Sequence, residues 1–322
     1  MTGTVLILGA NGRVGRATTL AFANAGWQVR AASRLGKSAP VKGVSNIACD
    51  VLDQAALIDA AQGADVIVHA VHPAYPDWAK IMPIHTANII AAGLASGATV
   101  LISVNVYPFG ENAAVTLDEN DTPVPTTRKG VLRVTMEHAF KDAAEQGLRS
   151  VVLRSGDFIE QTKSGNWFDA YITNKVHKGK FTYPGRMDAV HAWAYLPDVA
   201  QAMVGLAEQR AGLPAFSSFG FEGFSLTGAE LMAAAEKAVG RALRRSYFPW
   251  PLLRALSPFS PLIYETLEMR YLWNTPHRIE GSALRAALPG FVVTPLAEAM
   301  ADVLGPVVSD RSVMRQAVGR SA

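Results

Sequence analysis

A glycine-rich turn near the amino terminus carries the clearest chemical pattern in the sequence. Gly9-Ala10-Asn11-Gly12-Arg13-Val14-Gly15 follows an apolar run at 5–8 and precedes a segment with helical spacing of apolar residues. The first glycine permits a tight turn, the second a close approach of backbone to ligand, and the third close packing of helix on strand. The helix end that follows offers free N–H groups and a positive dipole end to an anion. We therefore interpret the turn as a cradle for the diphosphate of a dinucleotide.

Strands alternate with helices through the first half of the chain, which is the pattern of βαβ units and a parallel sheet. Gly26 stands where a helix C-cap glycine is expected, and Asp53 is a predicted N-cap. Strands are predicted at 5–8, 27–33, 44–49, 64–70, 99–104 and 150–153, and helices at 16–25, 54–61, 76–96 and 129–146. Six such strands predict an α/β fold with a doubly wound parallel (Rossmann) sheet.

The pattern loosens after about residue 153, where we expect a smaller, mostly helical, carboxyl-terminal substrate domain. A short strand and a helix to about residue 208, capped by Asp198, are predicted to pack back on the sheet. Further helices are predicted at 227–239 and 295–304. The expected division is 1–160, with about 190–210, for the dinucleotide-binding Rossmann domain, and about 161–189 with 211–322 for the substrate-binding domain.

Composition narrows the class of protein. The 322 residues are 49% hydrophobic and 18% charged, which is typical of a globular chain. The net charge of +3 comes without a run of Lys and Arg, so nucleic-acid binding is not indicated. The single cysteine, Cys49, cannot form an internal disulfide, and cytoplasm is the expected compartment. The first residues indicate a strand and no signal peptide, and no apolar stretch of about 18 residues predicts an integral membrane segment.

Several further segments, in the right order, resemble the extended and atypical short-chain dehydrogenase/reductases, the group that includes the NAD-dependent epimerases/dehydratases and the NmrA-like proteins. The likeness begins with the spacing of the glycines around Asn11. It continues with Ala32-Ser33-Arg34, Cys49-Asp50-Val51, His69-Ala70-Val71-His72, Ser103-Val104-Asn105-Val106-Tyr107, Leu153-Arg154-Ser155-Gly156 and Tyr195-Leu196-Pro197-Asp198-Val199-Ala200. The resemblance implies that Asp50 and Val51 contact the adenine, and that Ala70 and Val71 pass beneath the cofactor ribose.

The choice of cofactor depends on the end of the second strand, where an acidic residue binds a ribose 2′-hydroxyl and a basic one a 2′-phosphate. No Asp or Glu occurs between Val29 and Lys37, whereas Arg34 and Lys37 are present and Arg13 lies in the glycine turn. NADP is therefore favoured, with NAD as the alternative. Isolated cations on loops are often only solvated surface residues, and Arg34 is the strongest candidate of the three.

The catalytic residues depart from the family pattern. The family places a Tyr and, four residues later, a Lys on one helix face, so that the ammonium lowers the pKa of the phenol. Aligned on Met136 and Glu137, those positions fall on Lys129 and Arg133. Arg133 can still bind a ribose but cannot donate a proton at neutral pH. The remaining catalytic candidates are Ser103, Tyr107 at the carboxyl end of the fifth strand and Lys129, although the last two have ordinary packing and solvated-surface alternatives.

Other chemistries find little support. The seven histidines form no H-E-x-x-H or Cys/His cluster, so no metal is predicted, and the G-x-S-x-G turn of α/β-hydrolases does not occur. His191 and Tyr195 are weaker candidates for lining a substrate cleft. The aromatic region at 248–273 is consistent with ordinary core, a lid over a hydrophobic substrate, a homodimer contact or a membrane-surface patch.

Two classes of function remain open. One is an NADP-dependent oxidoreductase or epimerase-like enzyme that acts on a small organic substrate with a non-standard proton donor. The other is a catalytically silent protein of NmrA-like type that senses the dinucleotide. Retained glycines with a lost Tyr are what both predict, so the sequence does not separate them.

Overall fold

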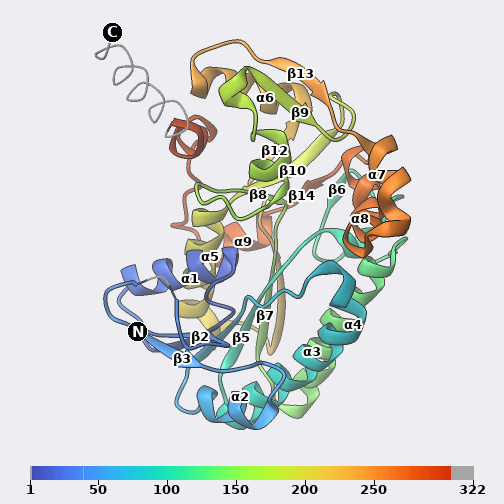
Figure 1. The fold of residues 1–322 in the computed structure, drawn as a ribbon. Helices are drawn as coiled ribbons and strands as arrows, with labels where there is room; N and C mark the ends of the chain where they lie inside the picture. The colour runs from blue at the N-terminus through green and yellow to red at the C-terminus, as the bar shows by residue number, and fades with distance from the viewer. Residues whose placement is uncertain (1, 39, 306–322) are drawn as a thin grey trace.

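A seven-stranded parallel sheet lies at the centre of the structure, a computed structural model that describes residues 2–38 and 40–305 (Figure 1). Its strands run in the order β11-β7-β5-β4-β1-β2-β3. They are β1 (Thr4–Leu8), β2 (Gln28–Ser33), β3 (Val44–Ala48), β4 (Val66–His69), β5 (Thr99–Val104), β7 (Ser150–Arg154) and β11 (Phe216–Gly220). The chain runs outward from β1 to β3 and then returns to β4 on the other side of β1. The ligand crevice of such a sheet therefore lies at the carboxyl ends of β1 and β4.

Helices cover both faces of this sheet (Figure 1). On one face α1 (Arg13–Asn24) packs against α5 (Leu196–Gln209), and on the other α2 (Gln54–Ala61), α3 (Trp78–Ser96) and α4 (Arg128–Asp142) pack in a row. Alternate residues of β1 serve the two faces, because side chains along a strand point in opposite directions. Val5 and Ile7 join the core beneath α1 and α5, and Leu6 and Leu8 join the core beneath α2 to α4. The predicted doubly wound fold is confirmed.

Local signals explain where most of these helices begin and end. The Asp53 carboxylate accepts a hydrogen bond of 3.0 Å from the N–H of Ala56, so the predicted cap of α2 is confirmed. Gly26, with φ of +80°, follows the end of α1 as expected. The cap predicted for Asp198 is wrong, because α5 begins at Leu196 after Tyr195. The Asp198 carboxylate instead accepts hydrogen bonds from the N–H and hydroxyl of Thr294.

The rest of the chain builds small sheets and short helices above the carboxyl edge of the central sheet (Figure 1). The strands are β6 (Thr116–Leu117), β8 (Asp157–Ile159), β9 (Lys180–Tyr183), β10 (Val190–Tyr195), β12 (Phe224–Thr227), β13 (Arg244–Tyr247) and β14 (Arg278–Ile279). The helices are α6 (Gly228–Val239), α7 (Trp250–Leu256), α8 (Pro261–Leu267), α9 (Ser282–Ala287) and a stretch at 296–305. Strand β11 belongs to the central sheet although its residues fall within 211–322, the range expected for the substrate domain. The division into two domains stays a prediction.

Within 2–38 and 40–305, none of the helices combines the length and apolar character needed to cross a membrane.

Candidate active site

The glycine turn joins β1 to α1 with almost no room for side chains. Gly9 has φ of +79°, in the left-handed region that favours glycine. A Cβ on Gly15 would lie 2.1 Å from the carbonyl oxygen of Gly9, so the first turn of α1 packs directly on the loop. Gly12 differs, because its φ of −74° suits any residue and its Cβ would meet the Gly9 oxygen at 3.2 Å. Gly9 and Gly15 are thus required by the fold, whereas a side chain at Gly12 would need the Gly9 carbonyl to shift by only a few tenths of an ångström.

The amino end of α1 is open to an anion. Gly12 is its N-cap residue, no side chain caps it, and the first turn holds no acidic residue. Arg13, Val14 and Gly15 form that turn, so their N–H groups and the positive end of the helix dipole face the same space. The arrangement suits a diphosphate, as the sequence predicts.

Asn11 and Lys37 lie together beside the turn. The side-chain amide of Asn11 donates a hydrogen bond of 2.7 Å to the carbonyl of Lys37. The N–H of Lys37 donates in turn to the hydroxyl of Ser33 at 3.1 Å, which fixes the loop after β2. Arg34, in the same loop, is exposed at the carboxyl end of β2.

Arg13 points away from that loop, toward a segment that the sequence analysis did not single out. Its guanidinium donates to the carbonyl of Ser164 at 3.3 Å and lies 3.6 Å from the carboxylate of the buried Glu160. The structure therefore gives Arg13 a partner across the crevice and leaves Arg34 and Lys37 at the end of β2.

The ends of β3 and β4 also reach the crevice. A Cβ on Gly9 would lie 2.9 Å from the carbonyl oxygen of Ala70 and 3.0 Å from Val71, so this segment passes directly under the glycine turn. Val51 is buried, and its carbonyl accepts a hydrogen bond of 2.8 Å from Asn88. The Asp50 carboxylate accepts from the N–H of Leu52. The residues predicted to contact the adenine and ribose thus follow the carboxyl ends of β3 and β4, which lie on either side of β1 and β2 in the sheet.

Tyr107 is buried in an aromatic cluster beyond the end of β5. Its hydroxyl lies 3.0 Å from that of Tyr75, and its ring stacks on Trp78 with centroids 6.3 Å apart. Burial, followed by the neighbouring Tyr75 and Asp157, raises the pKa of Tyr107 well above its ordinary value. The phenol therefore stays protonated at neutral pH. Ser103 is half-buried at the end of β5, opposite Leu153 of β7.

Lys129 is held in a buried ion-pair network. Its side chain is only 1% exposed, and its Nζ contacts a carboxylate oxygen of Glu265 and lies 2.6 Å from one of Glu268. Burial would raise the pKa of Glu265, but Lys129 and Arg128 outweigh it, so this pKa lies below its ordinary value. Lys129 Nζ also lies 5.0 Å from the ring centroid of Tyr75. Lys129 is thus held by two carboxylates and a ring, away from solvent.

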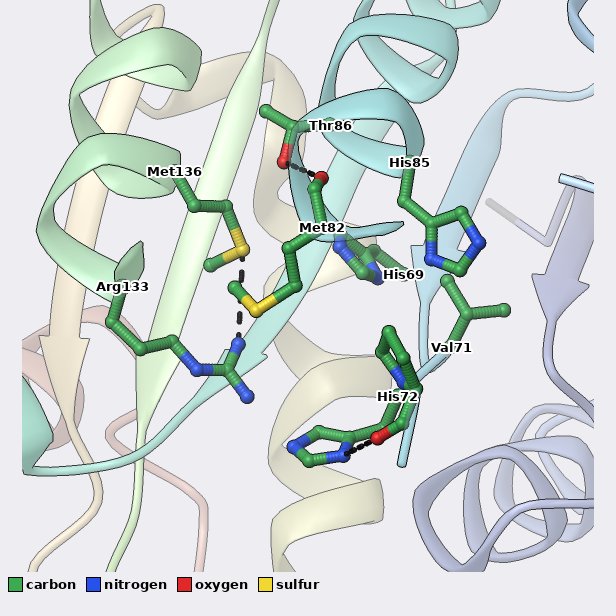
Figure 2. A pocket seen from close by; sticks show the side chains of 9 residues that line it. His69, Val71, His72, Met82, His85, Thr86, Arg133 and Met136 are labelled. Carbon is green, nitrogen blue, oxygen red and sulfur yellow. Dashed lines mark hydrogen bonds between the residues drawn. The ribbon is translucent and has the colours of Figure 1, made fainter. Parts of the chain in front are cut away.

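Arg133 lies between α4 and α3, beside a small cavity (Figure 2). Its guanidinium is 4.8 Å from the Trp78 ring centroid and contacts the sulfur of Met136 at 3.7 Å. Figure 2 shows His69 and His85 on the far side of Met82. The cavity of about 10 Å³ has room for roughly one water molecule, so it is not a substrate site.

His191 and Tyr195 are themselves buried, and each pairs with a carboxylate. The Nε2 of His191 lies 2.8 Å from the Asp157 carboxylate, and its ring stacks on Trp273 at 4.5 Å. The Tyr195 hydroxyl donates to Asp302 at 2.7 Å. Asp157 itself is partly exposed, and its charge helps to raise the pKa of both Tyr75 and Tyr107.

Sequence reasoning missed the partners that complete the site: Tyr75, Trp78, Asp157, Glu160, Glu265 and Glu268. Only Tyr75 and Trp78 had a usable signal, since they follow the end of β4, where ligand-binding residues of such a sheet are expected. Among the described residues, no group of His, Cys, Asp and Glu could hold a metal ion.

Comparisons with known proteins agree with this geometry. The family model for the NAD-dependent epimerase/dehydratase family matches residues 5–217, and the chain belongs to that family. The resemblance stated from the sequence is thereby confirmed. A comparison with curated protein sequences gives no match.

Solved structures show the same fold over nearly the whole chain. A Burkholderia cenocepacia protein provisionally assigned as an epimerase is 22% identical, with a TM-score of 0.75 over 96% of this chain and 98% of that one. MoeE5 in complex with UDP-glucose and NAD is 18% identical, with a TM-score of 0.75 over 97% and 100%. UDP-glucose 4-epimerase from Brucella ovis in complex with NAD is 16% identical, with a TM-score of 0.74 over 95% and 98%.

Buried neutral histidine makes the stability of the protein depend on pH. Burial, followed by the charges of Arg133 and His85, lowers the pKa of His69 from 6.5 to about 3. As pH falls below 6.5, His69 becomes protonated in the unfolded chain but stays neutral in the folded chain. The free energy of unfolding therefore decreases. We expect this residue to remove about 2 kcal/mol between about pH 7 and about pH 5.

The measurement is urea unfolding at both pH values, for wild type, His69→Asn and the control His138→Asn, which changes an exposed residue of α4. His69→Asn should flatten the pH dependence and His138→Asn should not. Equal pH dependence in wild type and His69→Asn would show that His69 does not supply it.

Proposed function

We propose that this protein is an NADP-dependent oxidoreductase, reductase- or epimerase-like, that acts on a small organic substrate. The observation that carries the proposal is the amino end of α1, which no side chain caps and which follows directly on the tightly packed glycine turn. When bound, the dinucleotide would supply or accept a hydride. The turn at residues 9–15 would hold its diphosphate, with Asp50, Val51, Ala70 and Val71 along the adenine and ribose.

The preference for NADP rests on the loop after β2. Arg34 is exposed there, Lys37 follows, and Glu160 already pairs with Arg13. An arginine can bind a 2′-phosphate with two parallel hydrogen bonds, whereas an acidic side chain would repel the phosphate. MoeE5 and the Brucella ovis epimerase are each described with NAD, so NAD is the alternative cofactor.

The proton is proposed to come from Tyr107. Lys129, fixed between Glu265 and Glu268, serves as a cation and not as a proton donor. Tyr107 keeps its proton at neutral pH, lies against the second phenol of Tyr75, and has Arg133 near enough to stabilise a phenolate. In a reduction, the Tyr107 hydroxyl would protonate the carbonyl oxygen of the substrate while Ser103 orients it. Arg133 would hold the ribose.

A second candidate function is supported by the same ion pair. The position where the family carries its phenol holds Lys129, which is buried and paired, so this face of α4 offers no hydroxyl for proton transfer. A protein that binds the dinucleotide without turning it over would need no donor there. Binding and turnover must therefore be measured separately.

Replacing Arg34 tests the choice of cofactor. Arg34→Ala should weaken NADPH binding about tenfold, because one charge-assisted contact to the 2′-phosphate is lost, and leave NADH binding unchanged. Titration calorimetry measures both, with Lys42→Ala, another exposed cation before β3, as the control. An equal loss for the two cofactors, or none, would contradict the assignment of Arg34.

Replacing Tyr107 tests the proton donor. Nicotinamide absorbance is followed with NADPH and a panel of aldehydes, ketones and enones. Tyr107→Phe should lower kcat by about 100-fold or more, which is the usual contribution of one general acid, and should leave the Kd for NADPH unchanged. Tyr264→Phe, on the exposed side of α8, is the control. Unchanged turnover in Tyr107→Phe would rule out this donor, and tight NADPH binding with no turnover in wild type would favour the second function.

A further inference from the structure

An apolar ridge projects from the outer side of the α7–α8 hairpin, residues 250–267. Figure 1 shows both helices at the edge of the molecule, away from the central sheet. The ridge consists of Leu252, Leu256, Phe259 and Leu262, which are 56%, 42%, 86% and 55% exposed. The inner side is anchored, since Trp250 is buried in the core of the carboxyl-terminal part and Leu253 and Leu267 pack against it. The outer side has no such partner within residues 2–38 and 40–305.

The segment around this ridge is strongly basic. Residues 241–278 hold six arginines and two glutamates, with no Lys or Asp, which is a formal charge of 6 − 2 = +4. Glu265 and Glu268 are both committed to Lys129 and Arg128. The arginines are exposed: Arg241, Arg244, Arg245, Arg254, Arg270 and Arg278. Arg254 lies on the hairpin, and Arg270 lies 5.7 Å from the ring of Trp250 at its start.

A shallow hollow lies beside the ridge. Its volume is about 410 Å³, and its lining residues are Arg128, Arg254, Ser257, Tyr264, Leu267 and Glu268. It offers the guanidinium of Arg254 and the hydroxyls of Ser257 and Tyr264 beside an apolar surface, while Arg128 and Glu268 pair with each other. A lipid phosphate headgroup matches that combination, because its charge meets the arginines while its acyl chains meet the ridge.

We propose that the α7–α8 hairpin docks on the surface of an anionic lipid bilayer, with the ridge inserted at the interface and the arginines facing the headgroups. The helices have 7 residues each, far short of the roughly 20 that span a bilayer, so the hairpin lies in the interface and does not cross it. A second copy of the chain fits less well. A two-fold interface would set the same basic segment against itself, with its glutamates already paired.

The docking surface adjoins the candidate active site. Helix α8 packs against the 3₁₀ turn Tyr75–Asp77, and its Glu265, with Glu268 just beyond, holds Lys129. The hairpin that meets the bilayer is therefore also the cover of the Tyr75–Lys129 region. The docking proposal does not depend on cofactor binding or turnover, and its test needs neither.

The test is flotation of the purified full-length protein with vesicles of phosphatidylcholine alone, or of phosphatidylcholine and phosphatidylglycerol in about equal amounts. The protein should float with the anionic vesicles only. Raising the salt from about 0.1 M to about 1 M should release it, because the screening length falls from about 10 Å to about 3 Å.

Variants locate the surface. The double change Leu256→Ser and Phe259→Ser should weaken vesicle binding by about tenfold or more, because less apolar surface is buried in the bilayer. Arg254→Glu should also weaken binding, because it replaces a cation with an anion that the headgroups repel. Val292→Ser removes a residue that is 81% exposed outside the hairpin and should bind like wild type. Thermal unfolding should be unchanged in all variants, since each altered side chain is exposed.

Two results would overturn the proposal. One is failure of the wild type to float with anionic vesicles, or equal flotation of the wild type and the double variant. The other is a wild-type dimer in light scattering that the double variant dissociates, without vesicle binding, which would assign the ridge to a second copy.

Discussion

The candidate site depends on how closely α1 starts against the end of β1. The missing side chain of Gly15 places the first helical turn on the carbonyl of Gly9, and the same carbonyl caps the N–H of Gly12 at 2.8 Å. Ala70 passes beneath. This packing leaves the dipole of α1 aimed at the crevice where the strand order reverses. The predicted cofactor contacts that follow β2, β3 and β4 are placed by the same parallel sheet.

Buried charged side chains lie near the phenols of Tyr75 and Tyr107 in the rest of the crevice. Lys129, a residue that would be costly to bury alone, is paired with two carboxylates from a distant segment, and the neighbouring Arg133 lies over Trp78. Tyrosine in these surroundings holds its proton. The site therefore places a paired lysine and a buried arginine beside phenols that keep their protons. It also explains why the loss of the family tyrosine does not leave the crevice without hydroxyl groups.

Most of the central fold could be predicted from the sequence because its signals are local. Alternating apolar runs, Asp53 and Gly26 gave the strands and helix ends to within a few residues. The glycine turn and the strand ends after it were found for the same reason. The pairing of Lys129 with Glu265 joins residues 136 positions apart, and no spacing rule reveals it. Asp198 misled because a capping residue type was present two positions inside the helix. Strand β11 and the two-residue strands β6 and β14 carried no periodic signal of their own.

Gly12 offers the most direct measurement of the central claim. Its φ of −74° suits any residue, and a Cβ would lie 3.2 Å from the Gly9 oxygen, so Gly12→Val should fold after a small shift of the turn. Its side chain would then occupy the space predicted for the diphosphate. In titration calorimetry with NADPH, NADP⁺, NADH and NAD⁺, the account predicts binding by wild type and by Gly290→Val, whose side chain would enter open space, and none by Gly12→Val. Absence of binding to any of the four by wild type, or undiminished affinity in folded Gly12→Val, would contradict it.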